Sequence, residues 1–291
     1  MTSATNIRRR RRIRIVSWLF SACCLLATLM CVGILLVLLW SIVEEGWAWL
    51  NLDFLRNFPS RYPQRAGIKS ALAGSLWLMS LTALFSLPLG VGAAVYLEEY
   101  AANNRWRKLI QTNISNLAGV PSIVYGILGL GLFVQTFALG RSIISGALTL
   151  TLVVLPIIIL ATQEALRSVP DSIRHASYAL GATRWQTVWC QVLPASVPGV
   201  MTGVILALSR AIGEAAPLVA AGAVAYVPFV PSSLADQYTA LPIQIFNWSS
   251  RPQADFHQVA GAAIIVLLAV LVTMNTVAVF VRYRYGKRIR W

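Results

Sequence analysis

The chain has 291 residues, of which 57% are hydrophobic and 12% charged, with a net charge of +14 and a pI near 10.4. This composition excludes a water-soluble globular domain, whose surface carries more charge, and a disordered chain, whose apolar content is lower. The basic residues stand beside the ends of long apolar runs, so the positive-inside rule explains the charge better than nucleic-acid binding does. We therefore expect an all-α membrane protein with several spans.

Segment 1–14 is expected to be a basic cytoplasmic N-terminus, because six arginines precede an uncharged run at 15–43. That run predicts a first membrane span whose start is retained in the cytoplasm. A cleaved signal ending near Cys23 is the alternative. The apolar run continues about twenty residues beyond Cys23, which is longer than the apolar core of a signal peptide, so an uncleaved span is favoured.

Six apolar runs are long enough to cross a bilayer as helices. Together they form one transmembrane domain at 15–281, followed by a basic cytoplasmic tail at 282–291. The third run is rich in glycine and is expected to pack inside the bundle or at a subunit interface, since small residues let helices approach closely. The expected spans are 15–43, 70–97, 109–140, 142–163, 197–222 and 256–281.

Six spans place both ends of the chain on one side of the membrane. Seventeen of the 24 Lys and Arg residues fall on that side and six on the other, with Arg210 inside a span. The positive-inside rule then predicts cytoplasmic termini and a cytoplasmic loop at 164–196. Three of the four cysteines lie in the first run and the fourth in this loop, so we expect no disulfide and, with two histidines, no metal or cofactor site.

The loop at 164–196 contains the signals of two short helices. Residues 168–171, Ser-Val-Pro-Asp, predict a capped helix start, and Gly181 suits the left-handed residue that ends such a helix. Residues 183–186, Thr-Arg-Trp-Gln, predict a second capped helix, which the Leu-Pro pair at 193–194 is expected to stop.

This helix pair is too small to fold as a domain, so it needs a surface to pack against. One interpretation is a docking surface for a partner protein; the other places Trp185 and Trp189 at the lipid headgroups. The apolar residues available for docking are Ile173, Ala176, Leu180, Trp185, Val188, Trp189 and Val192.

The fifth run contains two opposite charges, Arg210 and Glu214, spaced to meet on one helix face. An arginine near a helix centre costs roughly 2.5 to 3.5 kcal/mol on insertion, so neither side chain is expected to face lipid. A structural ion pair and a substrate pathway are both compatible with the spacing, and intramembrane ionisable groups favour the pathway. A guanidinium suits tetrahedral oxyanions, and Glu214 would compete with the anion for Arg210.

The helix pair resembles the cytoplasmic loop of permeases of ATP-binding-cassette importers, which has the pattern E-A-A, three residues, G, nine residues, I-x-L-P. Two positions depart from it, since His175 replaces the usual Glu and Gln191 an aliphatic residue. In that family the loop docks in a cleft of the ATPase subunit, which implies the same role for residues 175–194. The matching residues are His175, Ala176, Ser177, Gly181, Leu193 and Pro194.

Residues 210–218, RAIGEAAPL, are similar to the segment R-x-x-G-E-T-A-P-L of phosphate importer permeases of the PstA type. Segments at 119–126, 51–60 and 240–245 resemble other parts of the same family. The resemblance implies a six-span bundle of the ABC importer permease type with a cytoplasmic coupling-helix loop. It also implies roles in substrate translocation for Arg210 and Glu214.

The function implied by this resemblance is that of a permease subunit in an ATP-driven importer of inorganic phosphate. The implied location is a bacterial inner membrane, with a second permease subunit, two ATP-binding-cassette ATPase subunits and a periplasmic phosphate-binding protein as partners. Lipid and phosphate are the other expected contacts, and no nucleic acid is expected. None of the three lysines completes a Walker A motif, so we expect a non-catalytic subunit with ATP hydrolysis in a partner.

Three alternatives stay open. The transported anion can be another oxyanion, sulfate or molybdate. An autonomous secondary transporter can use Arg210 and Glu214 as a proton-coupled pair, although the inverted repeats common in that class are not visible. A membrane component that signals phosphate state can coexist with transport.

Overall fold

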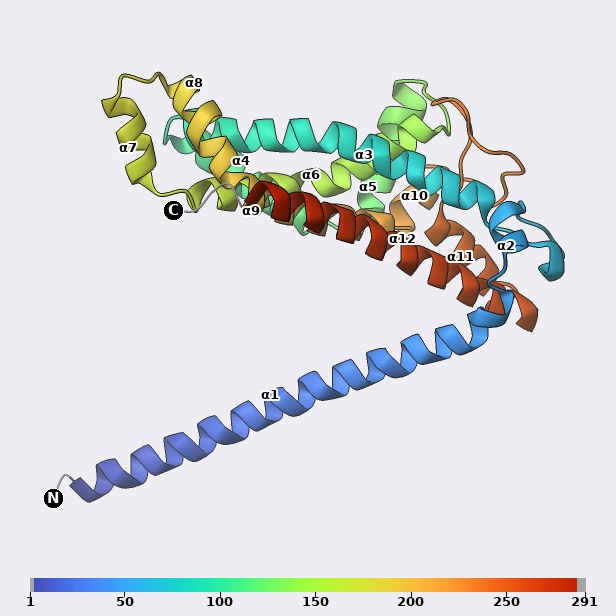
Figure 1. Ribbon diagram of the computed structural model, residues 1–291, viewed down its shortest axis with the longest axis horizontal. Helices are drawn as coiled ribbons and strands as arrows, with labels where there is room; N and C mark the ends of the chain where they lie inside the picture. The colour runs from blue at the N-terminus through green and yellow to red at the C-terminus, as the bar shows by residue number, and fades with distance from the viewer. Residues whose placement is uncertain (1–2, 287–291) are drawn as a thin grey trace.

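The computed structural model describes residues 3–286, and every regular element in that range is helical, which confirms the all-α class. Most of the long helices run side by side in one bundle (Figure 1). The first helix, α1 (Ser3–Gly46), diverges from the bundle and meets it near its last turn, against α12 (Ala254–Gly286). Residues 1–2 and 287–291 of the expected terminal segments lie outside the described residues.

Five helical stretches of the described chain are long and apolar enough to cross a membrane, and a bent pair of helices can provide a sixth. The helix α6 (Ile143–Arg167) is the most enclosed and packs between α3 (Lys69–Val95) and α9 (Leu193–Ile212). The five stretches are Val16–Trp49, Lys69–Tyr100, Ile143–Arg167, Arg184–Ile212 and Ala254–Arg284.

The third apolar run, expected as one span at 109–140, is not one straight helix. The helix α4 (Arg105–Ala118) ends early, and α5 (Ser122–Gly129) continues through a π-helical stretch to Thr136, bent by 102° from α4. Pro121 stands between the two helices and has no N–H to donate to the preceding turn, so the hydrogen-bond ladder is interrupted there.

The helix expected to stop at 193–194 does not stop, so this prediction is wrong. Helix α8 (Arg184–Thr187) continues through a π-helical turn at Val188–Val192 directly into α9. In that turn the amide of Leu193 donates to the carbonyl of Val188, five residues back. The wider turn leaves room for the ring of Pro194, which would clash with a carbonyl in a regular α-helix.

The fifth run, expected at 197–222, is interrupted near its far end. Helix α9 ends at Ile212, and a short helix, α10 (Ala216–Ala220), begins after three intervening residues. The interruption separates Arg210 from the rest of the resembling segment and places Glu214 between two helices.

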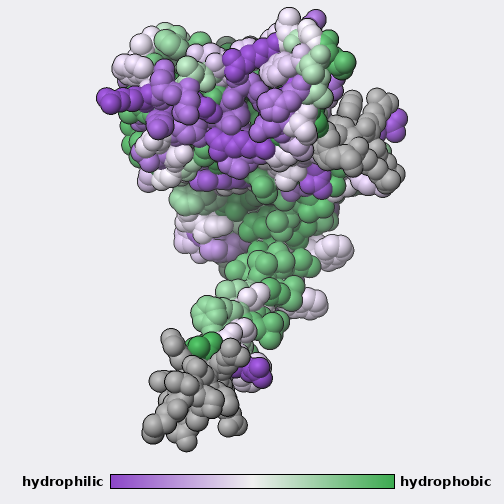
Figure 2. Space-filling view, turned by 90° about the vertical axis from the view of Figure 1, so that its left-hand side faces the viewer, coloured by the Kyte–Doolittle hydropathy of each residue, from purple (hydrophilic) through white to green (hydrophobic). Residues whose placement is uncertain are grey.

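The two ends of the bundle differ. At one end, α2 (Leu52–Arg56) and α11 (Leu241–Ser249) pack around the buried pair Phe54 and Trp248. At the other end, α7 (Asp171–Ala179) and α8 lie on the same side as the first residues of α1 and the last described residues of α12 (Figure 1). Figure 2 looks onto this second end, where hydrophilic residues dominate, with the apolar shaft of α1 below.

Candidate functional site

Arg210 lies in the last turn of α9, and Glu214 lies just past the end of that helix. The Nε of Arg210 donates to Oε1 of Glu214 at 3.2 Å, so the ion pair that their spacing predicts is present. Within residues 3–286, Glu214 is the one hydrogen-bond partner of this guanidinium. The two terminal nitrogens of Arg210 make no hydrogen bond to the described residues. The Arg210 side chain is 48% exposed, and a charge this open at membrane depth needs water, a ligand or another chain against it.

The short helix beyond Glu214 packs against the other broken span. A Cβ on Gly126 of α5 would come within 2.7 Å of the Cα of Pro217 in α10, so glycine is required for this close approach. The resembling segments 119–126 and 210–218 are therefore neighbours in space. Interrupted helices are tolerated at membrane depth where protein or a water-filled cavity surrounds the free backbone groups, and transport sites use them.

The loop at 164–196 matches the expected signals at the turn between α7 and α8 and departs from them at the start of α7. Gly181 has a φ of +81°, the left-handed conformation expected there. The amide of Thr183 donates to Gln186 Oε1 at 2.8 Å and the amide of Gln186 to Thr183 Oγ1 at 3.3 Å, completing the capping box. The cap expected at Ser168 is wrong, because its hydroxyl donates back to a carbonyl of α6 and Pro170 precedes the helix instead.

The residues predicted for ATPase coupling lie at three places around this turn. His175 and Ala176 are exposed on α7, and the Ser177 hydroxyl lies 2.8 Å from the hydroxyl of Thr187, which joins α7 to α8. Leu193 and Pro194 begin α9, where Leu193 is half-buried and Pro194 exposed. The last two residues thus belong to a continuing span rather than to the end of a separate hairpin.

The apolar residues predicted as docking surface divide into two sets. Val188 and Val192 are buried against the bundle, Ile173 is half-buried and Ala176 is exposed. Leu180 is 90% exposed, and the exposed indoles of Trp185 and Trp189 stack on each other with ring centroids 5.5 Å apart. An outward-facing group of large apolar side chains at this end suits contact with another protein or with the membrane interface.

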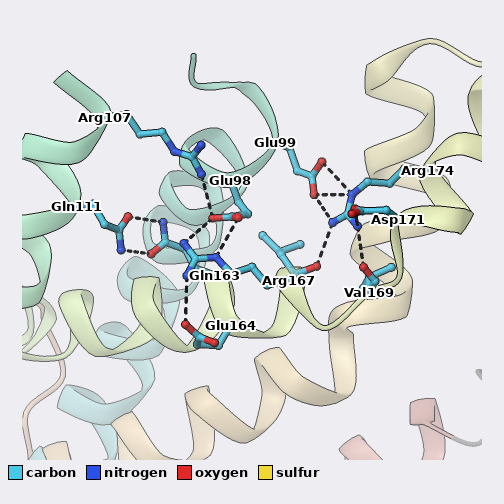
Figure 3. Close-up of polar contacts among 11 residues, drawn as sticks. Glu98, Glu99, Arg107, Gln111, Gln163, Glu164, Arg167, Val169, Asp171 and Arg174 are labelled. Atoms are coloured by element: carbon cyan, nitrogen blue, oxygen red, sulfur yellow. Dashed lines mark hydrogen bonds and ion pairs between the residues drawn. The ribbon is translucent and has the colours of Figure 1, made fainter. Parts of the chain in front are cut away.

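An ion-pair network that sequence reasoning missed holds α7 against the bundle (Figure 3). Glu99, 7% exposed in the π-helical turn Tyr96–Tyr100 after α3, accepts from Nη2 of Arg174 in α7 at 2.7 Å. Arg174 also donates to the backbone carbonyls of Val169 at 2.7 Å and Leu166 at 3.0 Å. Burial by itself would lower the pKa of Arg174, but the hydrogen bond and charge of Glu99, together with the charges of Asp171 and Tyr178, raise that pKa overall, so the guanidinium stays charged.

The residues on either side of Glu99 reach three further helices. The carboxylate of Glu98 accepts from Nε and Nη2 of Arg167 at the end of α6, both at 3.0 Å, and from Arg107 in α4 at 3.3 Å. The ring of Tyr100 lies under the guanidinium of Arg184 at the start of α8, 5.5 Å from the ring centroid. Three consecutive residues therefore contact α4, α6, α7 and α8.

A usable signal for this network was present in the sequence. The chain has ten acidic residues, and two of them stand side by side at 98–99, at the start of a polar loop whose other charges are basic.

The amides of Gln111 in α4 and Gln163 in α6 add reciprocal hydrogen bonds of 2.8 and 2.9 Å between these helices. Within residues 3–286, no cluster of three or more His, Cys, Asp or Glu side chains could hold a metal ion.

Comparison with known proteins identifies the family of this chain. Residues 86–291 match the family described as "Binding-protein-dependent transport system inner membrane component". The chain belongs to this family. It is therefore an importer permease of the ABC type and a multi-pass membrane protein, and the resemblance read from its motifs is confirmed.

Curated relatives of the family show similarity over most of the chain. The phosphate transport system permease protein PstA 1 of Mycobacterium tuberculosis is 33% identical over 264 residues, 87% of this chain and 83% of that protein. PstA of Mycobacterium leprae is 32% identical over 91% of this chain and 87% of that protein. The probable ABC transporter permease protein YqgI of Bacillus subtilis is 41% identical over 61% of this chain, and the match spans 60% of YqgI.

Solved structures of ABC importers share the fold of this family member. A chain of the inward-facing MetNI methionine ABC transporter has a TM-score of 0.60 at 18% identity, covering 83% of this chain and 98% of that one. A chain of a bacterial ABC transporter involved in the import of alginate has a TM-score of 0.62 at 17% identity, covering 95% and 99%. The expected bundle of the ABC importer permease type is confirmed.

Proposed function

We propose that this chain is a transmembrane permease subunit of an ATP-driven inorganic phosphate importer in a bacterial inner membrane. The observation that carries the proposal is the open guanidinium of Arg210 at the interruption of α9, within a segment similar to phosphate importer permeases. Relatives named as phosphate transport permeases at about one-third identity over most of the chain support the choice of anion.

Arg210 is proposed to bind the anion during translocation. A guanidinium offers planar pairs of N–H donors that match two oxygens of a tetrahedral oxyanion, and it stays charged at every physiological pH. Its contact with Glu214 uses one nitrogen at 3.2 Å, so an arriving anion meets free donors. Glu214 then competes for Arg210 as the anion leaves, which keeps binding weak enough for release.

ATP hydrolysis is proposed to take place in two partner ATPase subunits, with this chain non-catalytic. The exposed residues of α7 and the turn at Gly181 form the proposed docking loop, residues 175–194, for one of these subunits. A second permease subunit completes the pathway, and a periplasmic binding protein delivers phosphate at the α2 and α11 end. Both termini then lie in the cytoplasm.

The proposed mechanism is alternating access. The ATP-bound form of the ATPase pair favours the outward-open permease through its different affinity for the two states, since a ligand shifts an equilibrium only by that difference. Hydrolysis returns the permease to the inward-open state and releases the anion.

The test is uptake of radiolabelled phosphate into vesicles that contain the assembled complex, with and without ATP, and with sulfate or molybdate as competitor. We expect ATP-dependent uptake in wild type that neither competitor reduces, and loss of uptake with normal assembly in Arg210→Gln. Arg14→Gln, an exposed arginine in α1, is the matched control and is expected to transport as wild type does.

Three results contradict the proposal in different ways. Uptake without ATP identifies a secondary transporter, and inhibition by sulfate or molybdate identifies another oxyanion as substrate. Loss of assembly in Arg210→Gln assigns the ion pair a structural role. Continued phosphate signalling by a transport-dead Arg210→Gln complex adds a signalling role to transport.

A further inference from the structure

We propose that Glu98, Glu99 and Tyr100, here called the 98–100 clamp, transmit displacement of α7 into α3 and α4. The proposal rests on the proposed function, because it names the residues that connect the docking loop to the spans. Glu99 is the central positioning residue. It acts through Arg174 and touches neither substrate nor nucleotide.

The connectivity of the chain explains why such a contact is needed. Helix α7 follows α6 after three residues and is joined to α9 through α8, so a push on α7 reaches those helices along the backbone. Helices α3 and α4 have no such connection to it. Besides their packing against α6, these helices reach α7 through the clamp, where Glu99 holds Arg174 of α7 and Glu98 holds Arg107 of α4 (Figure 3).

The burial of the central pair makes the link rigid. Glu99 is 7% and Arg174 14% exposed, and the guanidinium has two backbone carbonyls as further acceptors. A charge enclosed in this way cannot exchange its partner for water without a large desolvation cost. The pair therefore resists separation when α7 is displaced.

Apolar packing beneath the clamp joins the same elements. One hydrophobic cluster includes Leu97 beside the clamp, Leu166 of α6, Val169 of the loop and Val192 before α9, with Ile173 of α7 packed against it. Because close-packed interiors transmit strain, this layer and the ion pairs move together as one body.

The same arginines provide matched controls. Asp171 contacts Arg174 at 3.2 Å but is 82% exposed, and Glu164 contacts Arg167 at 3.3 Å but is 76% exposed. Exposed pairs of this kind contribute little to stability. Asp171→Asn thus removes a carboxylate from the same guanidinium without opening the buried pair.

The first experiment measures the distance between spin labels on α4 and α7 in the assembled complex, before and after ATP binding. The labels are placed at the exposed positions Lys108 and Ser172, in a background whose four native cysteines are replaced by serine. We expect the wild-type distance to stay constant because the clamp holds both helices in one body. In Glu99→Gln we expect the distribution to shift or broaden on ATP binding, and in Asp171→Asn to match wild type.

The second experiment measures phosphate transported per ATP hydrolysed. We expect Glu99→Gln to lower this ratio roughly tenfold while hydrolysis continues, because the substitution removes the negative charge opposite Arg174 and replaces one of the two acceptor oxygens with a donor. Arg174→Lys keeps the charge opposite Glu99 but loses donors, so its ratio is expected to lie between those of wild type and Glu99→Gln.

Three results overturn the proposal. The first is a wild-type label distance that changes on ATP binding, and the second is a Glu99→Gln complex equal to Asp171→Asn in both experiments. The third result applies if Glu99→Gln fails to assemble. In that case Arg174→Lys is the test, and a wild-type ratio of phosphate transported per ATP hydrolysed in this variant overturns the proposal. The label distance needs no phosphate, so absence of phosphate uptake contradicts the proposed function and leaves this test in force.

Discussion

Two arginine–glutamate contacts at different levels of the bundle, Arg174 with Glu99 and Arg210 with Glu214, differ in how completely the chain surrounds them. Arg174 at the α7 end is 14% exposed and has Glu99 and two carbonyls as acceptors. Arg210 at the end of α9 is 48% exposed and has one contact to Glu214. The guanidinium of Arg174 finds its hydrogen-bond acceptors within this subunit, whereas the guanidinium of Arg210 keeps N–H donors free for water, a ligand or another chain.

This difference separates a contact that holds helices together from one that is able to exchange partners. A buried, fully satisfied pair resists any change of partner because desolvated charges cannot be left alone. A partly exposed pair on one element loses little when a competing anion arrives. Four sets of substitutions, given from the largest expected effect to the smallest, break or sharpen the comparison.

Removing each arginine in turn is expected to change stability unequally. Arg174→Ala leaves the buried Glu99 carboxylate unpaired and should cost about 3 kcal/mol, whereas Arg210→Ala should cost less than about 1 kcal/mol. Thermal unfolding of the purified complex, followed by circular dichroism, measures both. Equal decreases of melting temperature in the two variants would show that the two ion pairs contribute equally to the stability of the complex.

Exchanging the charges of the exposed pair separates anion binding from helix locking. The double variant Arg210→Glu with Glu214→Arg restores an ion pair but moves the guanidinium out of α9 into the interruption. We expect phosphate uptake to stay roughly 100-fold below wild type, about 2.7 kcal/mol of lost interaction. Arg210→Lys is the control that keeps the charge in place, and recovery of uptake in the exchanged variant would identify a structural pair.

Substituting Gly181 tests the turn that sets the direction of α7. Open space surrounds this glycine, so its φ of +81° is the only obstacle to a side chain. Gly181→Val should cost about 1 to 2 kcal/mol through backbone strain and reduce phosphate transported per ATP. Gly181→Asn is expected to remain close to wild type because asparagine tolerates this conformation; a valine variant with the wild-type ratio would contradict the coupling role of the turn.

The smallest effect is expected in the outer loop, at Asp236. Hydrogen bonds from the amides of Ser232 and Ser233, at 2.8 and 2.9 Å, lower the pKa of this carboxyl. A lowered folded-state pKa means that the stabilisation is present at neutral pH and is lost as the pH falls through that pKa. We expect Asp236→Asn to unfold at a slightly lower temperature than wild type at pH 7, and the difference to shrink as the pH falls below about 4 and to vanish below the lowered pKa.

A difference between Asp236→Asn and wild type that does not shrink as the pH falls below about 4 would show that the amide changes the loop by another route. The carboxylate is partly exposed and its hydrogen bonds stay within its own loop, so it also serves as the reference for a contact that neither locks helices nor binds substrate.

Local signals predicted much of this protein. The apolar runs, the left-handed Gly181, the capping box at Thr183 and the contact between Arg210 and Glu214 all depend on residues within a few positions of each other. Backbone geometry and side-chain reach decide such features without reference to the rest of the fold. The motif spacing also identified the family that comparison with known proteins confirmed.

Local signals failed where the answer depends on a wider turn or on a distant neighbour. Pro194 was expected to end a helix, but the π-helical turn before it makes room for the ring. Pro121 breaks its span because α5 can turn away and pack against α10. A proline therefore has opposite effects in the two places, and the surrounding packing decides which one occurs.

The sequence by itself determined which stretches are apolar and long enough to cross a membrane, where the chain turns at Gly181 and which two charges meet in the fifth apolar run, because each follows from hydropathy or from short spacing. Only the tertiary structure decided that Glu99 meets Arg174, 75 residues away, and that segments 119–126 and 210–218 lie together. It also decided that one ion pair is enclosed and the other open. The physical reason is that burial and long-range pairing depend on how helices are placed against one another, which short-range residue patterns do not encode.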